Sequence, residues 1–368
     1  MKNAKIVLIV LLGVVILGLC VLLGIGLGGR MRNGGSWWGG WNVSESNTCH
    51  LVQEQEFSAE DIDSISIDYT KSSNDVTIYE AEGDSVIVRE YASYEAADGE
   101  LAQIKCQAGK LTVKGPRWHN VFFNFNRYMY TEVYLPTDYA GELKINTVSG
   151  EISITMDLLL DGQLNLCSTS GDIYAGSQNI RAEKINVSST SGEIRLPVLE
   201  AGEVNISTTS GDISVKEGNS FMSCSSTSGE IIISGGQGDR RVSSTSGDVR
   251  VDGLSGSIQV NTTSGEILVR GEKGDGKLQS TSGDVLFSVE ALTGDISVNT
   301  SSGEVILELP ENASLDFEAS TTSGDINTFF DEALSFSKKG NHAKGTVGSG
   351  DREISITTTS GDVNIRKR

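Results

Sequence analysis

The sequence predicts an all-β fold: a single-stranded β-solenoid of about 18–21 residues per turn, with two facing parallel sheets. Three observations support this prediction. The triplet Ser-Gly-Asp/Glu recurs at a nearly fixed interval, and the segments on either side of it alternate apolar and polar residues with period two. The composition also suits a thin, turn-rich β protein, with 43 Gly, only 4 Pro and 6% aromatic residues.

The first element in the chain is a predicted transmembrane helix over residues 6–29, which follows a cytoplasmic stub of residues 1–5. The 24 residues of this run contain no charge and no Pro. At 1.5 Å per residue the run spans about 36 Å, enough to cross a hydrocarbon core of ~30 Å. A cleaved signal peptide is the alternative, but its apolar region would be only about 7–15 residues long. We therefore expect a single-pass protein of the cell membrane with an extracytoplasmic body.

Two segments separate this helix from the regular repeats. Residues 30–56 are predicted to form a polar juxtamembrane tether, and residues 57–140 to form irregular N-terminal β turns of the solenoid. Within the second segment, Ile65 to Ile78 has the pattern of a strand, a corner and a second strand. Ile104 to Val113 is expected to repeat that pattern.

Residues 141–368 are predicted to form the regular repeat solenoid with a C-terminal cap. The repeat is defined by eleven corner glycines, Gly150, Gly171, Gly192, Gly211, Gly229, Gly247, Gly265, Gly283, Gly303, Gly324 and Gly361. Strand arms of about five residues flank each corner, which is too short for a helix. The final interval of 37 residues predicts one degenerate turn hidden there. An interruption rich in Phe, at 329–336, is expected to cap the open end of the stack.

The residue types at the corner indicate a structural role for each position. Gly is expected to supply a positive φ without a Cβ clash. The flanking Ser and Asp can bond nearby backbone groups and hold the bend. Ser or Thr stands three residues before every corner Gly, and its parity points inward. Buried hydroxyls need partners, so we expect a ladder of hydroxyls along the corner.

An acidic residue follows every corner Gly, and for ten copies Glu and Asp alternate without an exception. Two interpretations are open. The column could bind cations or a polycation, or it could serve only to hold the corners and keep the protein soluble. Neighbouring carboxylates at about 4.8 Å repel by just under ~1 kcal/mol in water, so the column needs no metal to exist. The calcium-solenoid signature G-G-x-G-x-D is absent.

A candidate interaction stripe comes from the position three residues after the corner Gly, which has outward parity. Most copies carry a polar residue there, but four carry Ile232, Leu268, Leu286 and Ile306. In a register stack the last three fall on consecutive rungs, which predicts a contiguous apolar stripe. The alternatives are that segment 329–349 folds back over the stripe, or that the residues reflect β-propensity alone.

Composition excludes several classes of function. Lys+Arg is 29 and Asp+Glu is 49, so the net charge is −20 and the chain repels nucleic-acid phosphates. Only 3 His are present, and none of the 5 Cys forms a C-x-x-C pair. We identify no catalytic, cofactor-binding or metal-ligating constellation. An enzyme is therefore not expected, and no cofactor is expected.

The layout resembles the bacterial putative-adhesin domain family of unknown function, the LiaG-like β-solenoid proteins of Gram-positive envelopes. The residues that carry the resemblance are Asp63-Ser-Ile-Ser-Ile-Asp-Tyr69, Val133-Tyr-Leu-Pro136, the Thr-Ser-Gly-Asp/Glu corners and the closing Gly348-Ser-Gly-Asp351 through Val363. The resemblance implies a membrane-anchored surface scaffold or adhesin, whose partner is an unknown surface macromolecule. The alternative is a cell-envelope-stress or signalling accessory that acts on a membrane protein.

Overall fold

The computed structural model describes residues 49–116, 127–176, 179–337 and 340–368. Almost all of the described chain lies in strands and turns, as predicted, and the described residues form one compact unit. The predicted stub and transmembrane helix, residues 1–29, lie outside the described residues. Within the described ranges there is no helix long and apolar enough to cross a membrane.

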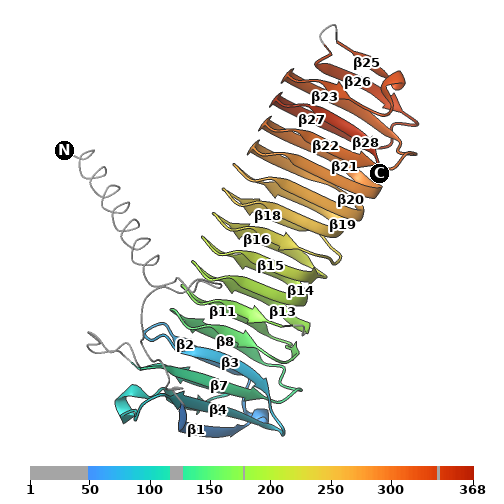
Figure 1. Ribbon diagram of the computed structural model, residues 1–368. Coiled ribbons are helices and arrows are strands. Elements are labelled where there is room, and N and C mark those ends of the chain that lie inside the picture. Colours follow the sequence, from blue (N-terminus) through green and yellow to red (C-terminus); the bar gives the residue numbers. More distant parts are fainter. Residues whose placement is uncertain (1–48, 117–126, 177–178, 338–339) are drawn as a thin grey trace, which may run out of the picture. The chain divides into compact units, whose positions relative to one another are not determined.

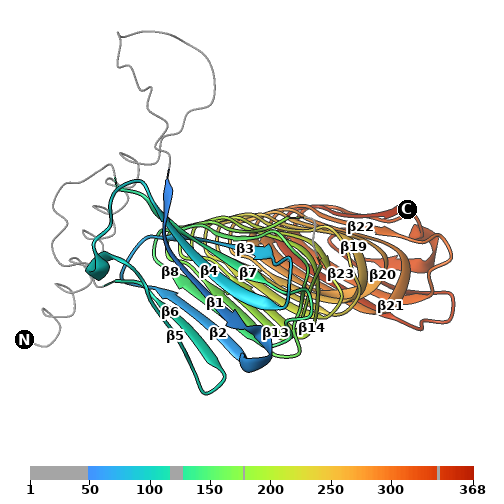
Figure 2. The same cartoon turned by 90° about the horizontal axis from the view of Figure 1, so that it is seen from below.

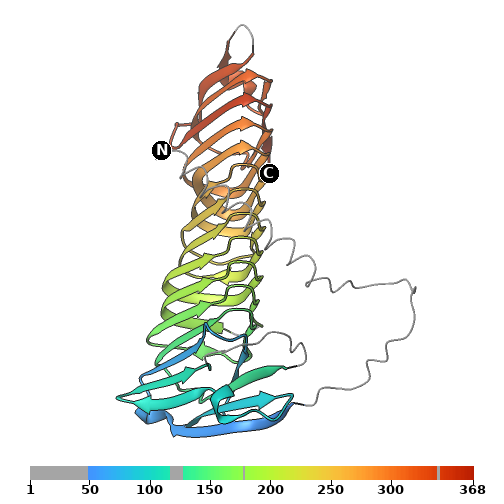
Figure 3. The ribbon, with the colours of Figure 1, turned by 90° about the vertical axis from the view of Figure 1, so that its left-hand side faces the viewer.

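The compact unit is a stack of β rungs (Figures 1 and 3). Each rung is one turn of the chain and contributes one strand to each of two facing sheets. We call them the pre-corner sheet and the post-corner sheet, because the Ser-Gly-Asp/Glu corner joins them within each rung. Successive rungs pair in parallel at intervals of 18–21 residues, as Leu164 with Ile185 and Ile213 with Ile231 illustrate. The predicted repeat is therefore the structural repeat.

Twelve strands lie wholly in the pre-corner sheet and eleven in the post-corner sheet. In spatial order the pre-corner strands are β5 (Gln103–Gln107), β6 (Lys110–Lys114), β2 (Ser64–Tyr69), β8 (Glu142–Thr147), β11 (Gln163–Cys167), β13 (Asn179–Ser188), β16 (Phe221–Ser226), β18 (Arg240–Ser244), β27 (Glu353–Ser360), β23 (Leu315–Ser323), β26 (His342–Val347) and β25 (Leu334–Phe336). The post-corner strands are β1 (His50–Ser58), β4 (Ser85–Ala92), β7 (Met129–Leu135), β3 (Asp75–Glu80), β9 (Ile152–Ile154), β12 (Ile173–Ala175), β15 (Ile213–Gly218), β17 (Ile231–Ile233), β22 (Val305–Leu309), β28 (Val363–Lys367) and β24 (Ile326–Asn327).

Four longer strands pass from the post-corner sheet around the second corner into the pre-corner sheet. They are β14 (Ile194–Ser207), β19 (Val249–Asn261), β20 (Ile267–Ser282) and β21 (Val285–Ser302). A two-residue strand, β10 (Leu158–Leu159), pairs with β13. The 3-10 turns are η1 (Ala59–Asp61), η2 (Asp98–Glu100) and η3 (Asp331–Ala333).

The core is the narrow space between the two sheets. Alternation along each arm sends every second side chain inward, where β-branched and leucine residues of neighbouring rungs stack. Leu143, Leu164 and Ile185 form one such column on the pre-corner side, and all three are fully buried. Cys224 is buried in the same layer.

The N-terminal end departs from a regular stack (Figure 2). β1 pairs antiparallel with β4, and β4 pairs antiparallel with β7. β5 and β6 form an antiparallel hairpin within one sheet, so the strand–corner–strand prediction for Ile104 to Val113 is wrong. The two residues at the hairpin turn, Ala108 and Gly109, both have positive φ, which reverses the chain instead of turning a corner. β1 begins at His50, inside the range 30–56 predicted as a tether.

A buried acidic group lies in this N-terminal part. Glu90 on β4 is fully buried and points into the core. Its carboxylate accepts hydrogen bonds from the Tyr69 hydroxyl at 3.0 Å and the Ala102 amide at 2.8 Å. The Tyr69 hydroxyl also lies 2.5 Å from the hydroxyl of buried Thr131. Burial raises the pKa of Glu90.

The C-terminal end contains the largest difference from the predicted order. The last rung, β27 and β28, lies between the rung of β21 and β22 and the rung of β23 and β24. Figure 1 shows β27 in deep red below β23, with the C-terminus beside the stack and not at its tip. The prediction of a degenerate turn in the last interval is wrong, because residues 334–347 form the antiparallel pair β25–β26 instead.

Candidate functional site

The corner glycines stack in one column, but the predicted reason for glycine holds at only some of them. Positive φ is found at Gly303, Gly324 and Gly361, and not at the eight earlier corners. At the earlier corners the cause is a close approach between rungs. A Cβ on Gly229, for example, would overlap the carbonyl oxygen of Gly211 on the preceding rung. Glycine is therefore required for packing along the stack.

The Ser or Thr three residues before each corner is buried, as predicted, and most of its hydrogen bonds lie within its own rung. At the first seven corners its hydroxyl accepts the corner Gly N–H, at distances of 2.8–3.1 Å; the residues are Thr147, Ser168, Ser189, Thr208, Ser226, Ser244 and Thr262. Thr147, Ser189 and Thr321 also donate to a carbonyl oxygen on an adjacent rung. From Gly283 onward the corner changes, and Gly283 N–H donates to the Ser302 carbonyl instead. The hydroxyls of Ser280, Thr300 and Thr358 then have no hydrogen-bond partner among the described residues.

The acidic column has a structural role at its Asp positions. Every Asp of the column except Asp325 reaches across to the next rung and accepts the backbone N–H of the acidic residue there, as Asp248 Oδ1 does from Glu266 at 2.8 Å. The same bond joins Asp75 to Glu151, Asp172 to Glu193, Asp212 to Glu230, Asp284 to Glu304 and Asp362 to Asp325. No group of three metal-ligating side chains occurs in the part of the chain that the structure describes. These contacts support the capping interpretation of the column.

The candidate stripe lies on the outer face of the post-corner sheet. Leu268 pairs with Leu286, and Leu286 with Ile306, on three adjacent rungs. Ile232 lies two rungs before Leu268, and Arg250 stands between them. All four apolar side chains are half-buried. The Arg250 guanidinium turns along its own strand and bonds Asp252 at 2.6 Å.

The C-terminal interruption packs elsewhere. β25 and β26 extend the pre-corner sheet beyond β23, whereas the stripe belongs to the post-corner sheet. Phe330 packs edge-on against the buried ring of Phe317 at 5.5 Å, and Phe329 packs against Phe330 at 4.9 Å. Phe329, Phe330 and Leu334 therefore cover the far end of the core, where an open stack would expose it.

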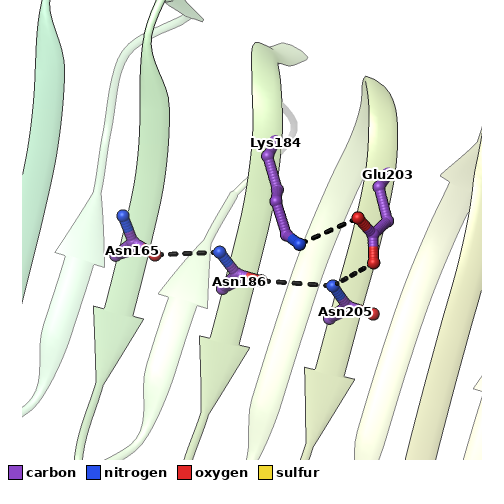
Figure 4. A network of polar contacts seen from close by, with 5 residues as sticks. All are labelled: Asn165, Lys184, Asn186, Glu203 and Asn205. Atoms are coloured by element: carbon purple, nitrogen blue, oxygen red, sulfur yellow. Dashed lines mark hydrogen bonds and ion pairs between the residues drawn. The ribbon is translucent and has the colours of Figure 1, made fainter.

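The outer face of the pre-corner sheet is polar. Asn186 Nδ2 donates to Asn165 Oδ1 at 2.9 Å, and Asn205 Nδ2 donates to Asn186 Oδ1 at 3.2 Å. Asn205 also bonds Glu203, which pairs with Lys184 at 2.8 Å (Figure 4). Asn side chains on adjacent rungs thus satisfy one another's hydrogen bonds. The outer face of the pre-corner sheet is polar here, whereas the outer face of the post-corner sheet carries the apolar stripe.

Sequence reasoning missed a cluster of tyrosines at the N-terminal end of the post-corner face. Tyr91 stacks on Tyr130 at 4.8 Å, and Tyr79 stacks on Tyr134 at 5.3 Å. The Arg89 guanidinium lies 4.8 Å from the centre of the Tyr134 ring. The sequence does show tyrosines at alternate positions between 128 and 134. They predict a cluster only once the register of β3, β4 and β7 is known, because that register brings Tyr79 and Tyr91 beside them.

Comparison with known proteins places the chain in a family. The profile of the Toastrack DUF4097 family matches residues 62–252 and 222–366, which together cover most of the chain. The protein therefore belongs to the Toastrack DUF4097 family. No protein with a curated description matches it.

Solved structures of low sequence identity are also similar. A "putative adhesin" from Parabacteroides distasonis is 14% identical, with 72% of this chain and 94% of that chain covered and a TM-score of 0.37. A "putative adhesin" from Bacteroides fragilis is 13% identical, with 66% and 96% covered and a TM-score of 0.36. A "Putative lipid binding protein" from P. distasonis is 17% identical, with 85% and 96% covered and a TM-score of 0.31.

Proposed function

We propose that the protein is a membrane-anchored, extracytoplasmic scaffold or adhesin that binds a surface macromolecule along its solenoid. The observation that carries this proposal is the register of Leu268, Leu286 and Ile306 on adjacent rungs of one outer face. With rungs about 4.8 Å apart, the contiguous row from Leu268 to Ile306 extends over about 10 Å. Ile232 lies two rungs further along, beyond Arg250. A contiguous apolar row on a rigid surface is typical of a contact with another molecule.

The chemistry of the opposite face supports this interpretation. On the same rungs as Leu268 and Leu286, the outward positions of the pre-corner sheet carry Gln279 and Asn299. If β-propensity alone determined outward residues, apolar side chains would appear on both faces. On these two rungs they occur on one face only, which favours a contact surface over a general preference for strand formers.

The membrane location rests on sequence. Residues 6–29 are long and apolar enough to span a bilayer, and the net negative charge of the chain lies entirely in the body that follows. A rigid stack tethered at one end would hold its binding faces away from the membrane. Such an arrangement suits a protein that presents a surface to an extracellular partner.

Adhesion of the full-length protein tests the proposal. Proteoliposomes carrying the full chain are incubated with isolated bacterial cell walls and with fibronectin-coated wells, and bound vesicles are counted. We expect binding to one of these surfaces, and a loss of at least tenfold in Leu268→Ser/Leu286→Ser. The matched control is Gln279→Ala/Asn299→Ala, which changes the opposite face of the same rungs. Equal binding by both variants, with unchanged melting temperatures, would remove the stripe as the contact site.

A further inference from the structure

A groove of about 500 Å³ crosses the outer face of the pre-corner sheet. It runs over the rungs of β16, β18, β19, β20 and β21, from Phe221 at one end to Asp295 and Ser297 at the other. With rungs about 4.8 Å apart, these five rungs span about 19 Å. The groove thus follows the long direction of the stack, at right angles to the strands.

One side of the groove is a column of cationic and amide side chains. Arg241 pairs with Gln259, and Gln259 pairs with Lys277, so the three stand on adjacent rungs. Arg241 and Lys277 are exposed, and none of the three side chains makes a hydrogen bond or ion pair with another described residue. In a chain with 49 acidic residues, two unpaired cations only two rungs apart in one column are notable. Their hydrogen-bond donors are available to a ligand.

The other side is a column of carboxylates, two residues earlier on each strand and thus about 6.8 Å away. Asp239 Oδ1 accepts the Ser257 amide at 3.1 Å, and Asp295 Oδ1 accepts the Glu353 amide at 2.8 Å. Asp275 accepts the Ser257 hydroxyl at 2.8 Å and the Thr293 hydroxyl at 2.6 Å. These bonds fix the three carboxylates in place, while lone pairs remain free to accept further hydrogen bonds.

The groove is preformed. Under it, the guanidinium of Arg240 is almost fully buried and donates to the carbonyl oxygens of Ser220 at 2.8 Å and Gly238 at 2.9 Å, as well as to Gly218. Arg240 thereby holds the turn that positions Asp239. At the end of the groove the Phe221 ring is 40% exposed, and it provides an apolar surface.

The cations on one side of the groove and the carboxylates on the other favour one class of ligand. A polyanion would approach Arg241 and Lys277 but would be repelled by the three carboxylates, and a polycation would meet the opposite conflict. A protein partner normally buries an apolar centre, and this groove offers only one exposed ring. A hydroxyl is both donor and acceptor, so a chain of hydroxyls can donate to the carboxylates and accept from the cations and the amide.

We propose that this groove binds a neutral, hydroxyl-rich glycan chain that lies along the stack. The sugar hydroxyls bridge the Asp239–Asp275–Asp295 side and the Arg241–Gln259–Lys277 side, and the apolar face of one ring packs on Phe221. The site lies on the opposite sheet from the apolar stripe. It extends the proposed role as a surface scaffold by naming a second ligand class, and it stands or fails independently of the stripe.

Calorimetry on the full-length protein in detergent micelles tests this assignment. The probes are three neutral hexasaccharides, namely cellohexaose, maltohexaose and N-acetylchitohexaose, with heparin and polylysine as charged probes. We expect at least one neutral hexasaccharide to bind with a Kd of 1 mM or tighter, which corresponds to about −4 kcal/mol. We expect Phe221→Ala and Lys277→Ala each to weaken that binding at least about tenfold.

The matched control is Lys144→Ala, because Lys144 is an exposed cation in the same outward column, several rungs from the groove. This variant and Leu268→Ser/Leu286→Ser should bind the hexasaccharide as the unmodified protein does. The proposal is overturned if none of the three hexasaccharides binds. It is also overturned if heparin or polylysine binds more tightly than they do, or if Lys144→Ala weakens binding as much as Lys277→Ala. Loss of vesicle adhesion without loss of hexasaccharide binding would count against the stripe alone.

Discussion

The amide of Asp325 donates to Asp362 Oδ1 at 2.9 Å, across 37 residues of sequence, and Asp362 occupies the inner of the two rungs. The rung that ends the chain is thus enclosed by two rungs that precede it. Its inward residues Ile354, Ile356 and Val363 are almost fully buried as a result. The C-terminus is a structural component of the stack and not a loose end.

Cross-linking tests this order. Ile306 pairs with Asn364, and Asn364 pairs with Asn327, so Ile306 and Asn327 are two rungs apart, about 9.6 Å. Neighbouring rungs place paired Cα atoms within the range that a disulfide bridges, and next-but-one rungs do not. We expect Ile306→Cys/Asn364→Cys to cross-link under mild oxidation and Ile306→Cys/Asn327→Cys to remain reduced, as read by peptide mass spectrometry. Stacking in sequence order would give the reverse.

The corner glycines lead to a second prediction. A Cβ at Gly229 would overlap the carbonyl oxygen of Gly211, so even Ala should be poorly tolerated. We expect Gly229→Ala to lower the free energy of unfolding by about 1–3 kcal/mol, as overpacking does. Gly83→Ala is the control, because a Cβ there meets nothing within 4 Å. Urea unfolding measures both, and equal stability of the two variants would show that the corners tolerate a side chain.

The repeat spacing is sufficient to predict most of the fold. Because one corner Gly recurs every 18–21 residues and both arms alternate, the register of Leu268, Leu286 and Ile306 follows directly. The position of the last rung cannot be predicted from the repeat spacing. Val305 and Val363 have the same apolar pattern after the same Ser-Gly corner, so local sequence carries no information about which rung is neighbour to which.

Of the two candidate sites, one could be predicted from the sequence and the other could not. The stripe could be predicted because its residues share one offset from the corner. The groove could not, because the second corner varies in length and the register shifts between Gly274 and Gly276. Whether a charge is paired also depends on neighbours one rung away. Lys184 finds Glu203 there, whereas Lys277 faces Gln259 and Ser297 and stays unpaired.

The acidic column gives a third prediction, in which adjacent residues of like charge behave differently. Asp248 accepts the Glu266 amide, whereas no hydrogen bond or ion pair is formed by the Glu266 side chain with the described residues. We expect Asp248→Ala to reduce the free energy of unfolding by about 1 kcal/mol. Glu266→Ala should change it by less than about 0.5 kcal/mol.

Calcium provides the complementary measurement for the column. A ligand that does not bind the native state cannot stabilise it, so millimolar calcium should leave the melting temperature unchanged if the carboxylates serve only the corners. A rise of several degrees that disappears in Asp248→Ala would show instead that the column binds cations.

The buried carboxyl of Glu90 leads to a prediction about pH. Burial raises its pKa in the folded protein, so the folded state holds this proton more tightly than the unfolded state does. The stabilising contribution is therefore complete below the unfolded-state pKa of about 4.3, and it is lost as the pH rises through the folded-state pKa. Glu90→Gln stays neutral at every pH, and its amide oxygen can still accept one of the two hydrogen bonds from Tyr69 and Ala102.

We expect the stability of the unmodified protein, measured relative to Glu90→Gln by urea unfolding, to fall as the pH is raised from about 4 to 8. Glu80→Gln on strand β3 of the same sheet is the control, because Glu80 is exposed. Its stability difference from the unmodified protein should stay flat over the same range. If the Glu90→Gln difference is equally flat, the folded and unfolded proteins hold the Glu90 proton equally tightly, and burial does not raise the pKa of this carboxyl.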